Sequence, residues 1–213
     1  MFYKTINEVV TAEFIIKKSR FISILIPLSQ LQDVEKELND AKQKYPRANH
    51  YCFAYIIRQD GSSLERCSDD GEPSGTAGWP ILNVLKKKKL ENIMAIVVRY
   101  FGGTLLGTGG LVKAYTLAVQ SSLDEAKAVT MEYSHSLLVR FNYNHYGSFE
   151  KLFFNIMNQV TDVQYTDVVS IEIWIAVDKL DDFIDKVDQL TGGTATIEFL
   201  EEGFKSHTIR SKG

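Results

Sequence analysis

The apolar and polar positions of the first 130 residues fall into blocks that predict a mixed domain of strands and helices. The apolar run 14–28 predicts one or two strands ending at Pro27. Segment 50–59 predicts another strand, because it is rich in aromatic and β-branched residues. The nearly continuous apolar run 92–101 predicts a central strand buried on both faces. Helical spacing of apolar residues predicts helices over 29–46, 76–89 and 108–126.

From about Met131 the pattern predicts a second unit. Alternating or β-branched runs predict strands at 136–143, 168–177 and 194–200. Helical spacing predicts helices over 148–160 and 177–190, and Gly192 and Gly193 end the second of them. The overall order over about 80 residues is that of a ferredoxin-like β-α-β-β-α-β motif. We therefore predict an α+β protein with two domains, residues 1–130 and 131–213.

Composition adds the class of protein and its compartment. A hydrophobic fraction of 45% and a charged fraction of 24% are ordinary for a globular chain. No segment reaches the ~20 apolar residues that a membrane span needs, and the first residues lack the apolar core of a secretory signal. Cys52 and Cys67 are too few for a disulfide framework. We expect a cytoplasmic protein without a membrane association.

Charge is spread unevenly over the two predicted domains. Residues 1–130 hold 17 Lys and Arg against 14 Asp and Glu, a balance of +3. Residues 131–213 hold 7 against 13, a balance of −6. A mildly basic first domain is compatible with nucleic acid, although ordinary scatter of surface charge gives similar numbers. The acidic second domain is a candidate surface for a protein partner.

A glycine-rich loop follows the central strand, with five glycines in nine residues. A Walker A loop requires lysine where Thr108 stands, and a dinucleotide fingerprint requires glycine where Val112 stands, so neither motif is present. An anion site is still compatible with the loop, because backbone amides converge at a helix N-terminus. Arg99 and Lys113 could add charge to it. The alternative is that the glycines serve tight turns and close packing.

A second loop, 68–78, holds Asp69, Asp70 and Glu72 within four residues. Mg²⁺ prefers oxygen ligands, so these carboxylates are candidates for a metal site; turn chemistry is the alternative. Thr76 is expected to cap the helix that follows. Because both loops precede predicted helices, the two helix N-termini could form one anion-binding surface.

No set of catalytic residues and no cofactor is predicted. His50 and Cys52 lie two residues apart on one face of a strand, but this pair with a distant Cys67 is a poor zinc signature. A buried cysteine beside a hydrogen-bonded histidine is the expectation here. Ser74 does not lie in the G-x-S-x-G context of a nucleophile elbow.

Both loops resemble the sequence signature of one family. The segments SDDGEPSGTAGWPIL and IMAIVVRYFGGTLLGTGGL resemble the YigZ/IMPACT family, and KKSRF and ANHYCFAY resemble its other blocks. The resemblance covers about the first 130 residues. It implies a β-α-β domain like those of a small-subunit ribosomal protein, elongation factor G domain IV and the GHMP kinases. A ferredoxin-like domain follows it in bacterial members.

The resemblance also implies a function in translation. The eukaryotic IMPACT protein regulates translation under amino-acid starvation through an additional N-terminal domain, and bacterial members are inferred to act on RNA or the ribosome. We predict that loop amides, with Arg99 and Lys113, contact phosphates and that Tyr100 or Phe101, if exposed, stacks on a base. The alternative for these two aromatics is burial in the core, because they follow an apolar strand. The candidate nucleic-acid- or phosphate-binding residues are Ser74, Gly75, Thr76, Arg99, Tyr100, Gly102, Gly103, Gly107, Thr108, Gly109, Gly110 and Lys113.

Two alternatives stay open. GHMP kinases place a glycine-rich loop before a helix on the same fold, which would make this chain an enzyme that binds a nucleotide or phosphate. That reading requires a general base and a catalytic lysine or aspartate near the loop, and the sequence offers no convincing set. The other alternative is a protein–protein interaction module that uses the acidic second domain.

Overall fold

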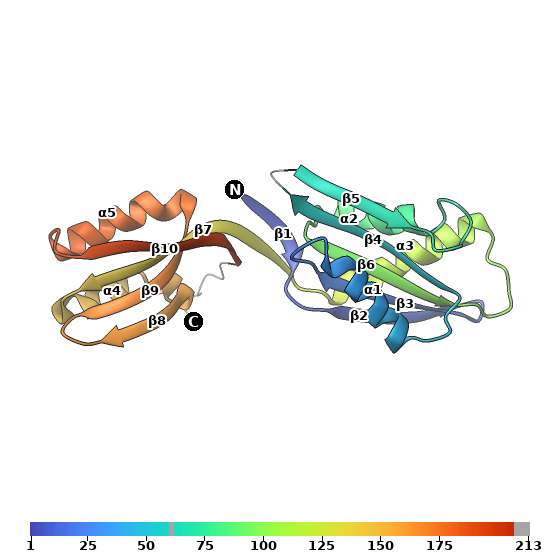
Figure 1. Cartoon of the computed structure of the whole chain (residues 1–213), viewed down its shortest axis with the longest axis horizontal. Helices are drawn as coiled ribbons and strands as arrows, with labels where there is room; N and C mark the ends of the chain where they lie inside the picture. The colour runs from blue at the N-terminus through green and yellow to red at the C-terminus, as the bar shows by residue number, and fades with distance from the viewer. Residues whose placement is uncertain (60–61, 207–213) are drawn as a thin grey trace. The chain divides into compact units, whose positions relative to one another are not determined.

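The chain forms two compact units in a computed structural model that describes residues 1–59 and 62–206 (Figure 1). The first unit is Lys4–Val129. The second comprises Met1–Tyr3 and the described residues from Thr130 onward. Each unit has one β-sheet with helices packed on it, so the protein is α+β with two domains. No helix within these described ranges is long and apolar enough to cross a bilayer.

A five-stranded antiparallel sheet forms the centre of the first unit. Its order is β2-β3-β6-β4-β5. The strands are β2 (Val10–Ile16), β3 (Ser19–Pro27), β4 (His50–Gln59), β5 (Ser62–Ser68) and β6 (Ile93–Tyr100). The predicted central strand is confirmed, because β6 is the middle strand and all its residues from Ile93 to Arg99 are buried. The predicted strands over 14–28 and 50–59 are also present.

Strand β5 was not predicted from the sequence, which assigned Ser68 and Cys67 to a loop. Its sequence SSLERCS is mostly polar and lacks an apolar alternation. The reason is its place at the edge of the sheet, where its side chains are exposed or half-buried and β4 is its one strand partner among the described residues.

Helices cover both faces of the first sheet. Helix α1 (Asp33–Lys44) packs on one face, and α2 (Gly78–Lys87) and α3 (Thr108–Glu125) pack on the other. Successive residues of β6 enter these two cores in turn: Ile96 and Val98 lie in the core with α1, and Val97 lies in the core with α2 and α3. The same alternation assigns Arg99 to the face of α2 and α3, and Tyr100 to the face of α1.

The second unit has the ferredoxin-like order. Its strands are β7 (Ala128–Phe141), β8 (Val160–Tyr165), β9 (Val169–Ala176) and β10 (Thr196–Ser206), and its α-helices are α4 (Tyr146–Leu152) and α5 (Leu180–Thr191). The sheet runs β10-β7-β9-β8, which is the 4-1-3-2 order of that motif, with antiparallel pairs throughout. Strand β1 (Phe2–Ile6) also pairs with β7. Gly192 ends α5 in the left-handed conformation, as predicted.

The helix predicted over 148–160 is shorter than expected. Helix α4 ends at Leu152, and a 3₁₀ helix, η2 (Phe154–Gln159), continues the chain. The apolar spacing that suggested one long helix is satisfied by both pieces, since Phe149 in α4 and Ile156 and Met157 in η2 pack into the same core.

Candidate functional site

The loops that the sequence singled out meet at one end of the first sheet. Strands β3 and β4 begin there and β6 ends there, because the register pairs Arg99 with Phe21 on one side and His50 on the other. The turn between β2 and β3 and the loop between β6 and α3 can be followed to this end in Figure 1. We call it the loop end; it comprises residues 17–18, 45–49, 69–77 and 101–107.

Arg99 is buried at the loop end and is 4% exposed. Its guanidinium carbon lies 5.4 Å from the ring centre of Phe21 and 5.5 Å from that of Phe101. Nη1 donates to Oε1 of Glu72 at 2.5 Å, and Nη2 donates to Oγ of Ser19 at 3.4 Å. Nε has no acceptor among the described residues. The charge that the sequence assigned to phosphate is therefore balanced in large part by a carboxylate.

Glu72 connects Arg99 to a buried polar network, and its side chain is 3% exposed. Oε1 also accepts from the hydroxyl of Tyr115 at 2.8 Å and lies 3.9 Å from Nε2 of His50. The Tyr115 hydroxyl lies 3.3 Å from Sγ of Cys52. Burial raises the pKa of the Cys52 thiol to about 12, against the opposing hydrogen bond of Tyr115 and with the help of the Glu72 charge. The thiol stays protonated at neutral pH and is a poor nucleophile.

His50 and Cys52 form the predicted pair of a hydrogen-bonded histidine and a buried cysteine. Nδ1 of His50 lies 2.8 Å from the carbonyl oxygen of Asp70. Cys52 is fully buried, and its thiol donates to the carbonyl oxygen of Asp69 at 2.9 Å. No cluster of three or more metal-ligating side chains occurs in the part of the chain that the structure describes.

The N-terminus of α2 is capped by Asp69 rather than by Thr76. Oδ1 of Asp69 accepts from the amides of Ala77 at 2.9 Å and Gly78 at 2.8 Å, and Oδ2 accepts from the amide of Gly75 at 2.8 Å. The prediction for Thr76 is wrong, because its hydroxyl donates to the carbonyl of the residue three positions earlier at 2.6 Å. The capping carboxylate comes from the loop, up to nine residues upstream of the amides it binds.

All three carboxylates of the acidic loop accept hydrogen bonds from protein groups. Besides Asp69 and Glu72, Asp70 accepts from the amide of Tyr51 at 2.6 Å. These contacts fit turn chemistry and a buried ion pair rather than a cage of oxygens for Mg²⁺. The paired amides also mean that the α2 end adds little to an anion surface; Ser74 is exposed beside it.

We expect Asp69→Ala to lower the free energy of unfolding of the first unit by about 2 kcal/mol, because three amides lose their acceptor. Burial raises the pKa of Asp69, but donation from the amides of Gly75, Gly78 and Ala77 outweighs burial and holds the pKa below its ordinary value. Ionised Asp69 therefore contributes to the free energy of unfolding at pH values above the pKa of the unfolded chain. This contribution is lost as the pH falls below about 4. Urea unfolding of the natural chain and of Asp69→Ala, from neutral to acidic pH, measures the loss of stability and its pH dependence. A difference between the two proteins that does not shrink in acid would contradict the role of Asp69 as the cap of α2.

The glycine loop packs against the turn between β2 and β3. The amide of Gly102 donates to Oγ of Ser19 at 3.1 Å. A Cβ placed on Gly102 would lie 2.0 Å from the carbonyl carbon of Lys18, so the two backbones are in direct contact. Gly103 and Gly107 have φ values of +79° and +73°, which favour glycine. Three of the five glycines therefore have structural reasons at these positions.

The N-terminus of α3 differs from that of α2. Gly107 is its N-cap, and within the described residues no side chain caps it and no acidic residue lies in its first turn. Its first-turn amides, including those of Gly109 and Gly110, have no partner inside the helix. Lys113 is exposed on the next turn. The open helix N-terminus at the loop end is thus that of α3.

A cavity of about 400 Å³ opens beside this helix end. Its polar wall is formed by Asn49, His50, Glu72 and Arg99. Its apolar wall includes Phe101, Leu105, Leu106 and Leu111. The sequence did not point to Asn49, His50 or Leu105 as site residues, although the strand alternation that buries Arg99 also carries His50 to the same face.

Tyr100 lies away from this cavity. It occupies the α1 side of the sheet, its hydroxyl donates to the carbonyl of Pro46 at 3.1 Å, and the guanidinium carbon of Arg20 lies 5.5 Å from its ring centre. Phe101 lines the cavity and is 44% exposed. Of the two aromatics proposed for stacking, Phe101 is the one placed to do so here.

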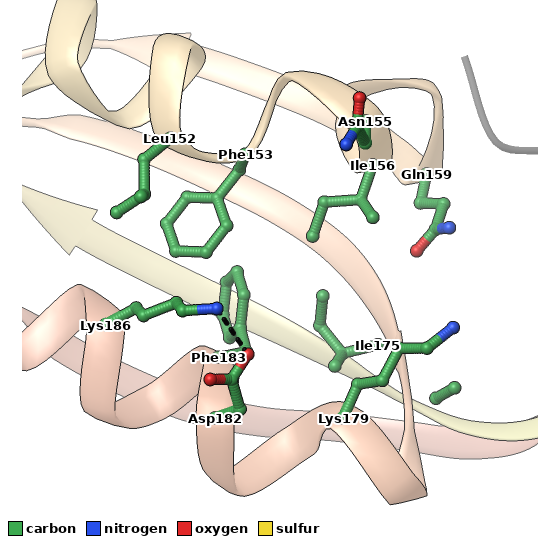
Figure 2. A pocket seen from close by; sticks show the side chains of 11 residues that line it. Leu152, Phe153, Asn155, Ile156, Gln159, Ile175, Lys179, Asp182, Phe183 and Lys186 are labelled. Atoms are coloured by element: carbon green, nitrogen blue, oxygen red, sulfur yellow. Dashed lines mark hydrogen bonds and ion pairs between the residues drawn. The ribbon is translucent and has the colours of Figure 1, made fainter. Parts of the chain in front are cut away.

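A smaller cavity of about 190 Å³ lies in the second unit, between α4, η2 and α5 (Figure 2). Figure 2 shows Phe153 and Phe183 in its apolar wall and Lys186 bonded to Asp182, whose Oδ2 lies 2.6 Å from Nζ. Its other lysine, Lys179, lies 3.8 Å from a carboxylate oxygen outside the cavity. The volume is below the range of about 300–1,000 Å³ usual for ligand sites, and both cations are paired.

These observations define an α+β protein with a buried ionic network and an open helix N-terminus at one end of its first sheet. Comparison with known proteins gives the family. A family model described as the Impact N-terminal domain matches residues 17–123, and a domain of unknown function (DUF1949) matches residues 139–194. The chain belongs to the IMPACT family.

Relatives match over most of the chain. The IMPACT family member YvyE of Bacillus subtilis is 33% identical over 196 residues, which cover 92% of this chain and 90% of YvyE. The IMPACT family member YigZ of Escherichia coli is 33% identical over 192 residues, 88% of this chain and 92% of YigZ. A crystal structure of a hypothetical protein is similar with a TM-score of 0.61 and 30% identity, covering 94% of this chain and 98% of the other.

Proposed function

We propose that the protein binds RNA, free or within the ribosome, through the loop end of its first domain and thereby modulates translation. Membership of the IMPACT family supports the link to translation that the sequence resemblance implied. The observation that carries the proposal is a set of basic residues with positive φ at the loop end, the end of the sheet from which α3 begins.

Three exposed cations at the loop end, Lys17, Lys18 and Arg47, have positive φ values of 44°, 68° and 62°. Positive φ is unusual for residues other than glycine and costs about 1–2 kcal/mol per residue. Among the described residues, none of the three has an ion-pair partner within 4 Å. Basic residues therefore occupy three positions whose backbone conformation favours glycine or asparagine. This strain suggests that the basic side chains are there for function.

The turn at Lys17 and Lys18 makes this contrast sharp. Two residues join β2 to β3, and a two-residue hairpin turn with both φ values positive is the type that favours Asn-Gly. The chain has two lysines there instead. Gly102 places the glycine loop against this turn, so the lysines lie near the loop that leads into α3. Phosphates contacted by the lysines and by the first-turn amides of α3 would lie along one surface.

We expect the double variant Lys17→Asn, Lys18→Gly to be more stable than the natural chain and to bind RNA less tightly. Relief of the turn strain should raise the free energy of unfolding by about 1 kcal/mol. Loss of two phosphate contacts should reduce the slope of log affinity against log salt by about 1.4. Fluorescence anisotropy with a labelled single-stranded RNA across a salt series gives the slope, and urea unfolding gives the stability.

Lys89→Gly is the matched control. Lys89 also has a positive φ, of 55°, and is exposed, but it lies four residues before β6 begins, at the opposite end of that strand from Arg99. This variant should gain similar stability with RNA affinity nearly unchanged. An equal loss of affinity in both variants would show a general charge effect and would contradict a site at the loop end. A partner complex that survives nuclease treatment, without RNA binding, would favour the protein-module alternative.

A further inference from the structure

We propose that the cavity at the loop end holds one nucleotide unit, with its base against the apolar wall and its phosphate at the N-terminus of α3. The unit is either an unstacked nucleotide of bound RNA, which rests on the proposed function, or a free nucleoside monophosphate. Both sources present the same chemistry, and the experiment below separates them.

The apolar wall is suited to the face of a base. Phe101 is 44% exposed although one side of it is in contact with the Arg99 guanidinium, and Leu105 is 82% exposed. Large apolar side chains at the mouth of a cavity contribute nothing to the core at such exposure. Stacking on an aromatic ring is how proteins take up unstacked bases of single-stranded RNA. The volume of about 400 Å³ lies in the range of small-molecule sites.

The phosphate position rests on two independent observations. The first is the end of α3, where Gly107 and Thr108 line the cavity and the first turn, in the described chain, carries neither a side-chain cap nor an acidic residue. The second is Arg99, which lines the same cavity, is buried, and has an Nε without an acceptor in the described part of the chain. Open amides and a buried Nε–H donor that lacks an acceptor both favour an anion.

The polar wall also offers hydrogen-bond acceptors beside Arg99. The contacts that Glu72 makes with Arg99 and Tyr115 fall on Oε1, and Oε2 accepts no hydrogen bond from any described residue. Nδ1 of His50 faces a carbonyl oxygen, so in the neutral ring Nδ1 carries the proton and Nε2 is an acceptor. Two acceptors side by side favour a base with an exocyclic amino group, such as cytosine or adenine, over uracil.

Free CMP, AMP and UMP titrated into the full-length protein by calorimetry test the cavity, and oligo-C and oligo-U RNA test the source. We expect CMP and AMP to bind about tenfold more tightly than UMP, since the buried carboxylate discriminates by hydrogen bonding. Thr108→Phe fills the mouth of the cavity and should abolish mononucleotide binding. Thr104→Phe is the matched control, because Thr104 is exposed on the same loop and does not line the cavity.

The outcomes separate this inference from the proposed function. Mononucleotide binding lost in Thr108→Phe but kept in Thr104→Phe supports the cavity; a parallel preference for oligo-C over oligo-U identifies RNA as the source. Mononucleotide binding without RNA binding supports a free nucleotide and overturns the proposed function. RNA binding that depends on Lys17 and Lys18, with no mononucleotide binding and no effect of Thr108→Phe, overturns the cavity and leaves the proposed function standing.

Discussion

Glu72→Ala is expected to lower the free energy of unfolding of the first unit by about 3–5 kcal/mol, which is the cost of breaking a buried ion pair from one side. Arg99 is 4% exposed and would keep its charge without the carboxylate that now lies 2.5 Å away. The Tyr115 hydroxyl would lose its acceptor at the same time.

Two further variants make this result specific. Glu65→Ala breaks an exposed pair with Lys86, in which Nζ lies 2.7 Å from Oε2, and should cost about 0–1 kcal/mol. Glu72→Ala combined with Arg99→Met removes both charges and should recover most of the loss. Trp79 lies in the first unit and Trp174 in the second. When these variants are made in a Trp174→Phe background, tryptophan fluorescence during urea unfolding therefore reports on the first unit. A Glu72→Ala loss no larger than that of Glu65→Ala would contradict the network.

Gly102→Ala is expected to destabilise the first unit by about 3 kcal/mol or more, since the added carbon overlaps backbone that cannot rotate away. It would lie 2.0 Å from the carbonyl carbon and 2.1 Å from the carbonyl oxygen of Lys18. Either the glycine loop or the β2–β3 turn must move. Because both carry the proposed phosphate contacts, RNA binding should fall together with stability.

Gly109→Ala is the control from the same loop. A Cβ on Gly109 meets nothing within 4 Å, and the residue lies in the first turn of α3 without a positive φ. Alanine there should leave stability unchanged or raise it by up to about 1 kcal/mol. Thermal and urea unfolding of the two variants, compared directly, measure the difference. Similar effects of both substitutions would show that the loop tolerates side chains generally and that the contact at Gly102 is not a constraint.

Local patterns predicted most of the fold. The apolar run of β6, the alternation of β9 and the glycine stop after α5 each depend on neighbours in sequence, and each is confirmed. β5 and the extent of α4 were missed, because an edge strand needs little apolar surface and because a 3₁₀ helix can satisfy helical spacing.

The site was harder to predict, because its contacts join distant segments. Arg99 was interpreted as a loop charge, although it continues the alternation of a strand whose next inward residue, Val97, is buried. Thr76 followed the local rule for a helix cap, whereas the actual cap, Asp69, reaches across a folded loop. No spacing rule pairs Glu72 with Arg99 or brings His50 beside them. The roles of the proposed RNA- and nucleotide-binding residues stay predictions.

The first three residues of the chain belong to the sheet of the second unit. The carbonyl of Met1 accepts from the amide of Tyr133 at 3.0 Å, and the ring of Tyr3 lies 4.9 Å from that of Phe204. During synthesis these residues leave the ribosome before the first unit does, yet their partners are made only after it. A tag or fusion placed before Met1 would therefore affect the folding of the second unit, which is synthesised last. Expressing the two units separately would cut β1 between Tyr3 and Lys4.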